Sequence, residues 1–290
     1  MSDITKTCVI GSPVEHSLSP FIHNAGYKEL NLNWKYSREV VDKSNFVQRI
    51  GDLISQGYVG FNITMPCKVE AFKFCNIVDG SAKRLKSVNT IVLRGGLTHG
   101  YSTDGEGFIN FLKDENIDFV GKKISIIGSG GASSLICDSL YHHGSHITIC
   151  ARNEIAANSI CENVLSFNIE VDKNISSIIS IALDDAGQVI ADSDIIINAT
   201  PVGMKTNKDE INVAPFNIEL LNNSQIVIDT IYHPLETYLL KEAKTLGCPV
   251  YNGVPMLLYQ AASSFELMTG FTAPIKIMRK ELMKEIQNRL

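Results

Sequence analysis

The run 122–152, KKISIIGSGGASSLICDSLYHHGSHITICAR, restricts the fold of this chain more than any other stretch. It contains an apolar run, a glycine-rich turn, a segment with helical character, a glycine and a second apolar run. Two strands that are joined through a helix usually lie parallel in one sheet, because the helix carries the chain back to the edge where the first strand began. We therefore expect a βαβ unit here and an α/β fold around it.

The turn in this unit has the composition of a phosphate-binding loop. It follows the first strand and opens the helix, and Ser133 stands where a third glycine or alanine is usual. The first glycine allows a tight turn, the second lets backbone amides approach a pyrophosphate, and the helix offers free N–H groups. The sequence predicts a dinucleotide site, with a glycine-rich turn without ligand as the alternative. The residues of the predicted site are Gly128, Ser129, Gly130, Gly131 and Ala132.

The end of the second strand bears on the choice between NAD and NADP. NAD sites usually carry Asp or Glu at this position, whereas NADP sites have a basic residue nearby. The chain has Arg152 there, and a guanidinium can bind a 2′-phosphate and stack on adenine. Glu154 is close and opposes this charge. These residues favour NADP as the cofactor.

The rest of the chain predicts two α/β domains. In the first hundred residues, apolar runs at 7–10, 34–41 and 58–64 alternate with helical patterns at 20–30 and 46–54, and a hairpin joins 88–93 to 99–101. After the βαβ unit come strands at 194–198, 225–229 and 249–251, a helix at 234–246 and an amphipathic tail helix from about residue 273. We expect a mostly parallel-sheet domain over 1–105 and a Rossmann-type dinucleotide-binding domain over 106–254. Residues 255–290 are expected to return to the first domain.

Composition and charge exclude several classes of partner. Hydrophobic residues make up 44% and charged residues 20% of the chain, and the net charge of −5 implies no general affinity for nucleic acid. No apolar run approaches the ~20 residues of a membrane span, and the N-terminus lacks a signal-peptide pattern. The seven cysteines form no C-x-x-C pair, which is typical of free thiols in a reducing cytoplasm. No metal is expected, because Gly144 interrupts the histidines at 142, 143 and 146 and no acid or Cys completes a site.

The stretch GFNITMPCK, residues 60–68, ends an apolar strand on polar side chains. Asn62, Thr64 and Lys68 bring an amide, a hydroxyl and an amine within seven residues. Sheets of α/β proteins bind ligands at the carboxyl ends of their strands, so these residues are candidates for a substrate site. A surface turn with Lys68 in solvent is the alternative.

With these pieces in place, the chain resembles the shikimate dehydrogenases over nearly its whole length. The matching pieces are GSP (11–13), HSLSP (16–20), HN (23–24), GFNITMPCK (60–68), SVNT (87–90), STDGEG (102–107), NATPVGM (198–204), DTIYHP (229–234) and NGVPMLLYQA (252–261). The resemblance implies reversible NADP-linked oxidation of the C3 hydroxyl of shikimate to 3-dehydroshikimate. It also implies a cleft between the two sheets, with substrate held by the first domain and NADP by the second.

The resemblance further implies roles for single residues. The catalytic pair falls on Lys68 and Asp104. The substrate contacts fall on Ser17, Ser19, Thr64, Asn89, Asp104, Tyr232 and Gln260, with Asn62 nearby, and the nicotinamide-side contacts fall on Thr230 and Gly253. A monomer or a homodimer is expected.

The chemistry of alcohol oxidation explains these residue types. Loss of a hydride from carbon is accompanied by loss of a proton from oxygen, which the protein must take. A lysine can carry this proton where its surroundings lower its pKa from ~10.4 toward ~7–8, or it can remain a cation and stabilise an alkoxide. Both roles stay open for Lys68. Two serines near a helix start suit a carboxylate, and amides and hydroxyls suit the substrate hydroxyls.

Several of these residues also have purely structural interpretations. Ser17 and Ser19 could cap the helix that starts at Pro20. Asp104 could cap the next helix, and Asn89 could be a turn residue.

The chain also departs from the usual pattern of the family. Ser102 replaces an Asn, Met268 stands where a Trp is common, and Arg152 lacks the second arginine that usually follows it. The expected clamp on a 2′-phosphate is therefore thinner. Because Lys68 and Asp104 are both kept, an active enzyme is favoured over a catalytically silent NADP-binding sensor. Quinate or a related cyclitol carboxylate is the alternative substrate.

Overall fold

The computed structural model describes residues 4–167, 172, 174–204 and 212–289. The chain divides into two compact units, which we describe separately. Unit 1 comprises residues 1–107 and 257–290, and unit 2 comprises residues 108–256. The ranges predicted from the sequence were 1–105 with 255–290, and 106–254; the function assigned to each range stays a prediction. No helix among the described residues is both long and apolar enough to cross a membrane.

The described part of unit 1 holds one six-stranded sheet in the order β2-β1-β3-β5-β6-β4. Strand β1 runs parallel to β2 and β3, whereas β5 runs antiparallel to both β3 and β6. The predicted hairpin between β5 and β6 turns at Gly95 and Gly96, which both have positive φ as a two-residue type I′ turn requires. The strands are β1 (Thr5–Gly11), β2 (Trp34–Val40), β3 (Tyr58–Ile63), β4 (Ile77–Val78), β5 (Thr90–Arg94) and β6 (Leu97–Tyr101).

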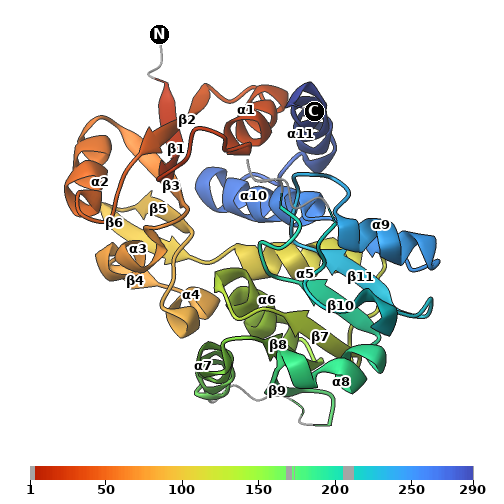
Figure 1. The fold of residues 1–290 in the computed structure, drawn as a ribbon. Helices are drawn as coiled ribbons and strands as arrows, with labels where there is room; N and C mark the ends of the chain where they lie inside the picture. The colour runs from red at the N-terminus through yellow and green to blue at the C-terminus, as the bar shows by residue number, and fades with distance from the viewer. Residues whose placement is uncertain (1–3, 168–171, 173, 205–211, 290) are drawn as a thin grey trace. The chain divides into compact units, whose positions relative to one another are not determined.

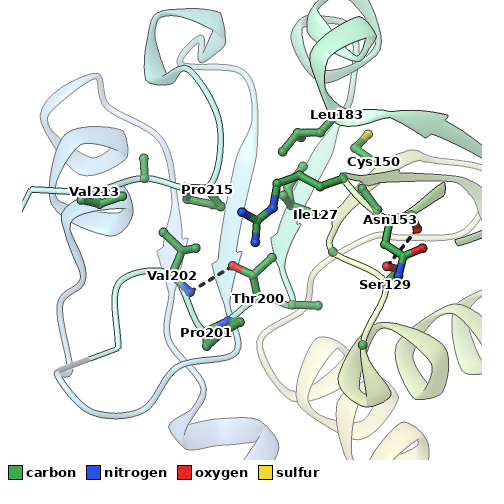
Figure 2. A pocket seen from close by; sticks show the side chains of 16 residues that line it. Ile127, Ser129, Cys150, Asn153, Leu183, Thr200, Pro201, Val202, Val213 and Pro215 are labelled. Atoms are coloured by element: carbon green, nitrogen blue, oxygen red, sulfur yellow. Dashed lines mark hydrogen bonds between the residues drawn. The ribbon is translucent and has the colours of Figure 1, made fainter. Parts of the chain in front are cut away.

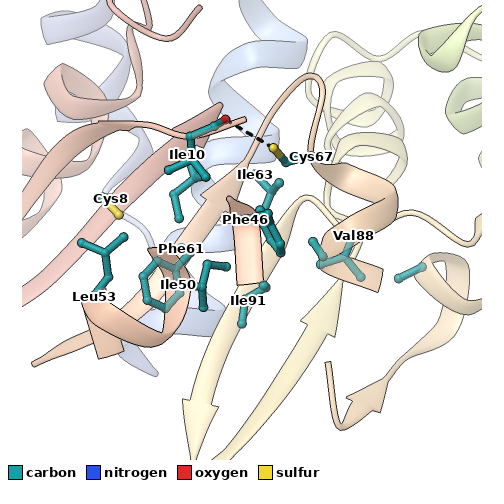
Figure 3. Packing of buried hydrophobic residues seen from close by; sticks show 13 residues of the cluster. Cys8, Ile10, Phe46, Ile50, Leu53, Phe61, Ile63, Cys67, Val88 and Ile91 are labelled. Carbon is teal, nitrogen blue, oxygen red and sulfur yellow. Dashed lines mark hydrogen bonds between the residues drawn. The ribbon is translucent and has the colours of Figure 1, made fainter. Parts of the chain in front are cut away.

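Helix α2 shows how this sheet acquires its core. Phe46, Ile50 and Leu53 recur at helical spacing, so they form one stripe, and each is fully buried. They pack against the alternate strand residues Phe61 and Ile63 of β3 (Figure 3). Each such side chain stabilises the fold by about 1.5–3 kcal/mol. Because strand side chains alternate, Asn62 lies on the opposite face of the sheet from this cluster.

The remaining helices of unit 1 include one from the end of the chain. Helix α11 packs on α1, and the two lie side by side (Figure 1). Its buried residues Met278, Leu282 and Ile286 recur every four positions. The predicted return of the tail helix to the first domain is therefore confirmed. The helices are α1 (Ser19–Glu29), α2 (Phe46–Ser55), α3 (Lys68–Phe74), α4 (Gly80–Leu85) and α11 (Ile275–Arg289), and the division between the units falls within α5 (Asp104–Asp114) and α10 (Val254–Thr269).

The described part of unit 2 holds a six-stranded sheet in the order β12-β11-β10-β7-β8-β9, with every neighbouring pair parallel. The predicted βαβ unit is present as β7, α6 and β8. The strands are β7 (Lys123–Ile127), β8 (His146–Ala151), β9 (Ser177–Ala182), β10 (Ile195–Asn198), β11 (Ile226–Asp229) and β12 (Val250–Tyr251). The helices are α6 (Gly131–His142), α7 (Glu154–Leu165), α8 (Gly187–Ala191) and α9 (Tyr238–Thr245), with 3₁₀ turns at Leu183–Asp185 and Ile218–Leu220.

One helix boundary in unit 2 differs from the prediction. The helix expected from Pro234 begins at Tyr238. Thr237 is its N-cap: the Thr237 hydroxyl accepts a hydrogen bond from the Leu240 amide at 3.3 Å and donates one to Asp229 at 2.7 Å. This tertiary contact, rather than the proline, fixes where the helix starts. The edge strand β9 and the short strand β4 were not predicted.

Candidate functional site

An ion pair between Lys68 and Asp104 is the centre of the polar site in unit 1. Lys68 opens helix α3, and Asp104 opens helix α5. Lys68 Nζ donates to Asp104 Oδ2 at 2.7 Å, and the two side chains are 28% and 15% exposed. Lys68 is therefore neither in free solvent nor sealed in the core. Asp104 lies in the first turn of α5 rather than before it, where the helix dipole favours a carboxylate.

Asn89 connects the end of the β-hairpin to the start of α5. Its Oδ1 accepts from the Thr103 amide at 2.9 Å, and its Nδ2 donates to Thr103 Oγ1 at 3.0 Å. The Thr90 hydroxyl also donates to Asn89 Oδ1, at 3.0 Å. Asn89 is buried, so these contacts fix the backbone immediately before Asp104. The interpretation of Asn89 as a simple turn residue does not describe this network.

Asn62 lies behind Asn89 in the same buried network. Its Oδ1 accepts from the Tyr36 hydroxyl at 2.6 Å, and its Nδ2 donates to Thr90 Oγ1 at 3.1 Å and to the Asn89 carbonyl at 3.4 Å. These bonds satisfy the carbonyl oxygen and engage the amide nitrogen. Asn62 therefore supports its neighbours within the site.

Ser17 and Ser19 lie together at the start of α1. Ser17 Oγ donates to Ser19 Oγ at 3.2 Å and accepts from the Ser19 amide at 3.3 Å. The N-cap residue itself is Leu18, which makes no side-chain cap bond. The two hydroxyls thus form a small polar pair that is only partly occupied in holding the helix start, and a pair of hydroxyl donors can bind a carboxylate.

Thr64 and Gln260 are the other predicted residues in unit 1. Thr64 follows β3, and its amide donates to the Ile10 carbonyl at 2.8 Å. Gln260 belongs to α10 and donates from Nε2 to the Leu257 carbonyl at 2.9 Å. The first turn of α5 packs tightly on this part of α10, because a Cβ at Gly107 would collide with the Gln260 backbone. Tyr232 belongs to unit 2, where it is 40% exposed.

Cys67, next to the ion pair, has no access for reaction. It is fully buried, and its thiol lies 3.4 Å from the Val41 carbonyl. Burial raises the pKa of the Cys67 thiol, so the reactive thiolate is disfavoured.

Unit 2 contains a cavity of about 640 Å³ beside the predicted phosphate loop. Figure 2 shows Ser129 and Asn153 on one side of it and Val202, Val213 and Pro215 on the other. Its lining residues come from the end of β7 and the phosphate loop, the end of β8, the 3₁₀ turn after β9 and the segment between β10 and β11. They are Ile127, Gly128, Ser129, Gly130, Cys150, Ala151, Arg152, Asn153, Leu183, Ala199, Thr200, Pro201, Val202, Val213, Ala214 and Pro215. A site with this volume, one cation and a mostly apolar wall suits part of a nucleotide.

The glycines of the loop keep one side of this cavity open. Gly128 has φ of +107°, and a Cβ there would lie 2.7 Å from Thr200 Cγ2, so the turn requires glycine. At Gly130 and Gly131 a Cβ would meet nothing within 4 Å. Ala132 continues the first turn of the twelve-residue helix α6. The free amides at this helix start can therefore be approached closely by an anion.

The cationic side of the cavity is formed by the end of β8. Arg152 is exposed and lines the cavity. Asn153 caps α7 by accepting from the Ala156 amide at 3.1 Å, and Glu154 lies in the first turn of that helix. A positive charge beside a phosphate loop fits a ligand with more than one phosphate group.

Thr230 and Gly253 lie next to each other, outside the lining of this cavity. Both the Thr230 amide and hydroxyl donate to the Asn198 carbonyl at 3.0 Å. The Gly253 amide donates to Ile231 O at 2.8 Å, and a side chain at this position would collide with the Thr230 carbonyl. Glycine is therefore required at 253 by the packing of the two segments.

A buried pair, Asn198 and Asp229, was not assigned a role from the sequence. Asn198 Oδ1 accepts from the Thr200 amide and hydroxyl at 3.0 and 2.7 Å, and Asn198 Nδ2 donates to Asp229 Oδ1 at 3.1 Å. Burial raises the pKa of Asp229, and its bonds to the Ile231 amide, Thr237 and Asn198 oppose this shift. The pair orders the loops that carry Thr200 and Thr230. Its signal in the sequence is a polar residue at the end of each of two adjacent apolar strands, IIIN and IVID.

Known proteins resemble this chain over nearly its whole length. A family model described as shikimate dehydrogenase substrate binding domain matches residues 9–91, one described as shikimate / quinate 5-dehydrogenase matches 112–215, and one described as shikimate 5′-dehydrogenase C-terminal domain matches 253–283. A shikimate dehydrogenase (NADP(+)) of Desulforamulus reducens is 36% identical over 285 residues, which cover 97% of this chain and 96% of that protein. The chain belongs to the shikimate dehydrogenase family.

Solved structures of the shikimate dehydrogenase family share the fold. One, a shikimate dehydrogenase in complex with NADP+, is 36% identical with a TM-score of 0.87 and covers 97% of this chain and 96% of its own. Another, a shikimate 5-dehydrogenase from Listeria monocytogenes in complex with shikimate and NAD, is 30% identical with a TM-score of 0.89 and covers 97% of both chains. The predicted fold class is thus confirmed, whereas the roles of the single site residues stay predictions.

Two departures from the usual family pattern have clear surroundings in this structure. Met268 is buried and packs against Gly60 of β3, where it completes the contact between α10 and the sheet. Ser102 is also buried, and its carbonyl accepts from the Ser81 hydroxyl at 3.3 Å.

Proposed function

We propose that this protein catalyses the reversible NADP-linked oxidation of shikimate to 3-dehydroshikimate, with Lys68 and Asp104 at the reacting hydroxyl. The observation that carries this proposal is the 2.7 Å ion pair between these residues, held beside the buried network of Asn62 and Asn89. A lysine beside a carboxylate can take the proton of a substrate hydroxyl as a neutral amine, and the ammonium that forms can return it to the ketone oxygen during reduction. The family relationship supplies the substrate class.

The remaining polar residues of unit 1 supply binding groups for a polyhydroxy acid. Ser17 and Ser19 offer paired hydroxyls to the carboxylate. Asn89 retains an amide hydrogen beyond its bonds to Thr103, and Thr64 and Gln260 provide a hydroxyl and an amide for the ring hydroxyls. Tyr232 is assigned to the substrate from unit 2. Asn62, whose bonds are already used within the protein, holds Asn89 in place.

The cavity of unit 2 fits the phosphates and the adenosine end of NADP. Gly128, Ser129, Gly130, Gly131 and Ala132 would hold the pyrophosphate at the start of α6, and Arg152 would hold the 2′-phosphate. Thr230 and Gly253 are assigned to the nicotinamide end. When bound, NADP accepts a hydride from the substrate carbon or returns one to the ketone.

Lys68 has two possible roles in this chemistry. As a proton carrier it takes the proton of the C3 hydroxyl during oxidation and returns it during ketone reduction. As a fixed cation it stabilises negative charge on that oxygen, while Asp104 holds it in position. The direction of the pH dependence distinguishes them. A proton carrier must be a neutral amine for oxidation and an ammonium for ketone reduction, so kcat falls at low pH in one direction and at high pH in the other. A fixed cation must stay an ammonium in both directions, so kcat falls at high pH in both.

The decisive experiment follows the absorbance of NADPH with purified protein, shikimate and NADP. We expect NADPH to form with shikimate and to be consumed with 3-dehydroshikimate. Absence of both reactions under saturating conditions would contradict the proposal and favour a silent NADP-binding relative. Quinate is the second candidate substrate, because one matching family model is described as shikimate / quinate 5-dehydrogenase. The ratio of kcat/KM for the two acids decides between them.

The cysteines bear on the compartment in which the enzyme works. All seven cysteines are free thiols, most of them buried, which supports a protein made in a reducing cytoplasm. We propose that it works there as a monomer or a homodimer on small molecules only.

A further inference from the structure

The loop that carries Ser17 is held by two arginines from distant parts of the chain. Arg38 of β2 donates from Nη2 and Nε to the Ser17 carbonyl, at 2.6 and 3.2 Å. Arg289, in the last turn of α11, donates from Nη1 to the His16 carbonyl at 2.8 Å. Two consecutive carbonyls of one loop are thus bound by two charged groups, and such bonds are stronger than neutral ones.

The same two guanidinium groups share an aromatic ring. Phe21 lies in the first turn of α1. The guanidinium of Arg38 is 5.4 Å from the centre of its ring, and that of Arg289 is 5.6 Å from it. Cation–π contacts of this kind add to the hydrogen bonds and restrict where each guanidinium can move. Arg38 of β2 and Arg289 of α11 therefore fix both the loop and the start of α1.

Bringing two like charges together opposes this arrangement. Burial and the nearby Arg289 both lower the pKa of Arg38, whereas Glu285 opposes the shift. Glu285 also binds Arg289 Nε at 2.8 Å and so fixes that side chain. Glu15, two residues before Ser17 in the same loop, is a second carboxylate near the two arginines. The charges of these four groups therefore balance, and the arginines act on the loop through their hydrogen bonds to its carbonyls.

We propose that Arg38 and Arg289 are positioning residues that hold the His16–Ser17 backbone so that the Ser17 hydroxyl is aimed at the substrate carboxylate. This inference rests on the proposed function, in which Ser17 and Ser19 bind that carboxylate. It gives the C-terminal helix a role in substrate binding, since the last turn of α11 reaches a loop 273 residues earlier in the chain. The inference also predicts which binding step changes. A misplaced loop weakens the binding of shikimate and leaves the cofactor site of unit 2 unaffected.

The test compares Arg38→Met, Arg289→Met and the double variant with the wild type in steady-state kinetics. Methionine keeps an apolar stem over Phe21 and removes the donors. Loss of a charged hydrogen bond should raise the shikimate KM about tenfold in each single variant, with the NADP KM unchanged and kcat altered less than about threefold. Because both arginines act on one loop, the KM of the double variant should rise by less than the product of the two single effects.

Arg49→Met is the matched control. Arg49 also lies in unit 1 and pairs with Glu39, the neighbour of Arg38, at 2.7 Å, so its loss removes a similar ion pair without touching the loop. Its shikimate KM should equal that of the wild type. Arg38→Lys should recover part of the KM effect, because an ammonium restores one of the donors.

Two results separate this inference from the proposed function. Turnover of shikimate by the wild type tests the function alone. If the wild type is active and both methionine variants keep its shikimate KM, even with a lower melting temperature, the arginines serve only stability and the inference is overturned. An equal rise in the KM values for shikimate and NADP overturns it as well, because the effect is then not confined to the loop.

Discussion

Lys68 and Asp104 are 36 residues apart in the sequence, yet their charged groups lie 2.7 Å apart. The sheet explains this. Strand β5 is antiparallel to both β3 and β6, so β3 and β6 run in the same direction and end at one edge. The helices that follow these strands, α3 and α5, open with the lysine and the aspartate. A parallel relationship between two strands thus brings an acid and an amine into contact at the edge where α/β sheets bind ligands.

Replacing Lys68 tests its part in the chemical step. Lys68→Ala should lower kcat by roughly 10²–10⁴, the usual contribution of an acid–base group. The shikimate KM and the melting temperature should change little, because a partly exposed ion pair contributes little to stability. Lys73→Ala, on the exposed side of the same helix, should behave as the wild type. A Lys68 variant that keeps more than a tenth of the wild-type kcat would show that the assigned role is wrong.

Removing the two hydroxyls at the start of α1 tests carboxylate binding. The double change Ser17→Ala and Ser19→Ala should raise the shikimate KM more than about tenfold, because a charged group loses two hydrogen bonds. The NADP KM should stay the same. The N-cap residue Leu18 makes no side-chain bond, so the loss of stability should be limited to the Ser17–Ser19 contacts, about 1 kcal/mol.

The control for this double variant is Ser55→Ala, which removes a hydroxyl bonded to the Asp52 carbonyl at the end of α2. It should affect neither KM. A double variant that is less stable but has a normal shikimate KM would mean that the serines serve only the helix start.

The sequence predicted best the helices and strands that depend on a local pattern of residues. The order of strand, glycine turn, helix and strand over 122–152 is a local pattern, and β7, α6 and β8 follow it. The tail helix was also predicted, because its apolar residues recur every three or four positions. In both cases the periodicity of the apolar residues decides the structure, and little else competes with it.

Contacts between segments that are distant in the sequence were harder to predict. The start of α9 was misplaced because Thr237 binds Asp229, which no local pattern reveals. The buried Asn198–Asp229 pair likewise depends on two strands being neighbours. For the site, the motifs suggested Lys68 and Asp104 through family resemblance, but the sequence alone gave no distance between them.

The buried histidine of α1 makes stability depend on pH. His23 is fully buried and stacks on Tyr36 at 4.2 Å between ring centroids. Burial lowers the pKa of His23 to about 3, whereas an unfolded histidine has a pKa of ~6.5. Between these values the unfolded chain binds the extra proton, so the free energy of unfolding falls as pH is lowered through this window. The slope from this one residue is at most about 1.4 kcal/mol per pH unit.

The variant His23→Phe keeps an aromatic ring beside Tyr36 and cannot titrate. Urea unfolding at several pH values between ~6.5 and ~4 should therefore show a shallower decline in the variant than in the wild type. His143→Phe, at an exposed position at the end of α6, serves as the control for an added ring. Equal slopes in His23→Phe and the wild type would contradict the assignment.

We predict that Arg152 sets how strongly the enzyme prefers NADP over NAD. It is the one arginine in the sequence of unit 2, and it lines the cavity beside the phosphate loop. A charged hydrogen bond to phosphate contributes about 1.5–3 kcal/mol, which corresponds to roughly ten- to a hundredfold in affinity. Arg152→Ala should therefore weaken NADP by one to two decades and leave NAD almost unchanged, because NAD has no 2′-phosphate to lose. Wild-type turnover with NAD should be measurable but inefficient.

The measurement is kcat/KM for both cofactors at saturating shikimate, with Lys241→Ala on the exposed side of α9 as the control. Glu154→Gln removes the opposing charge in the first turn of α7 and should increase the preference for NADP. An unchanged ratio of the two cofactors in Arg152→Ala would place the 2′-phosphate elsewhere, and a wild type that prefers NAD would overturn the assignment of the cofactor.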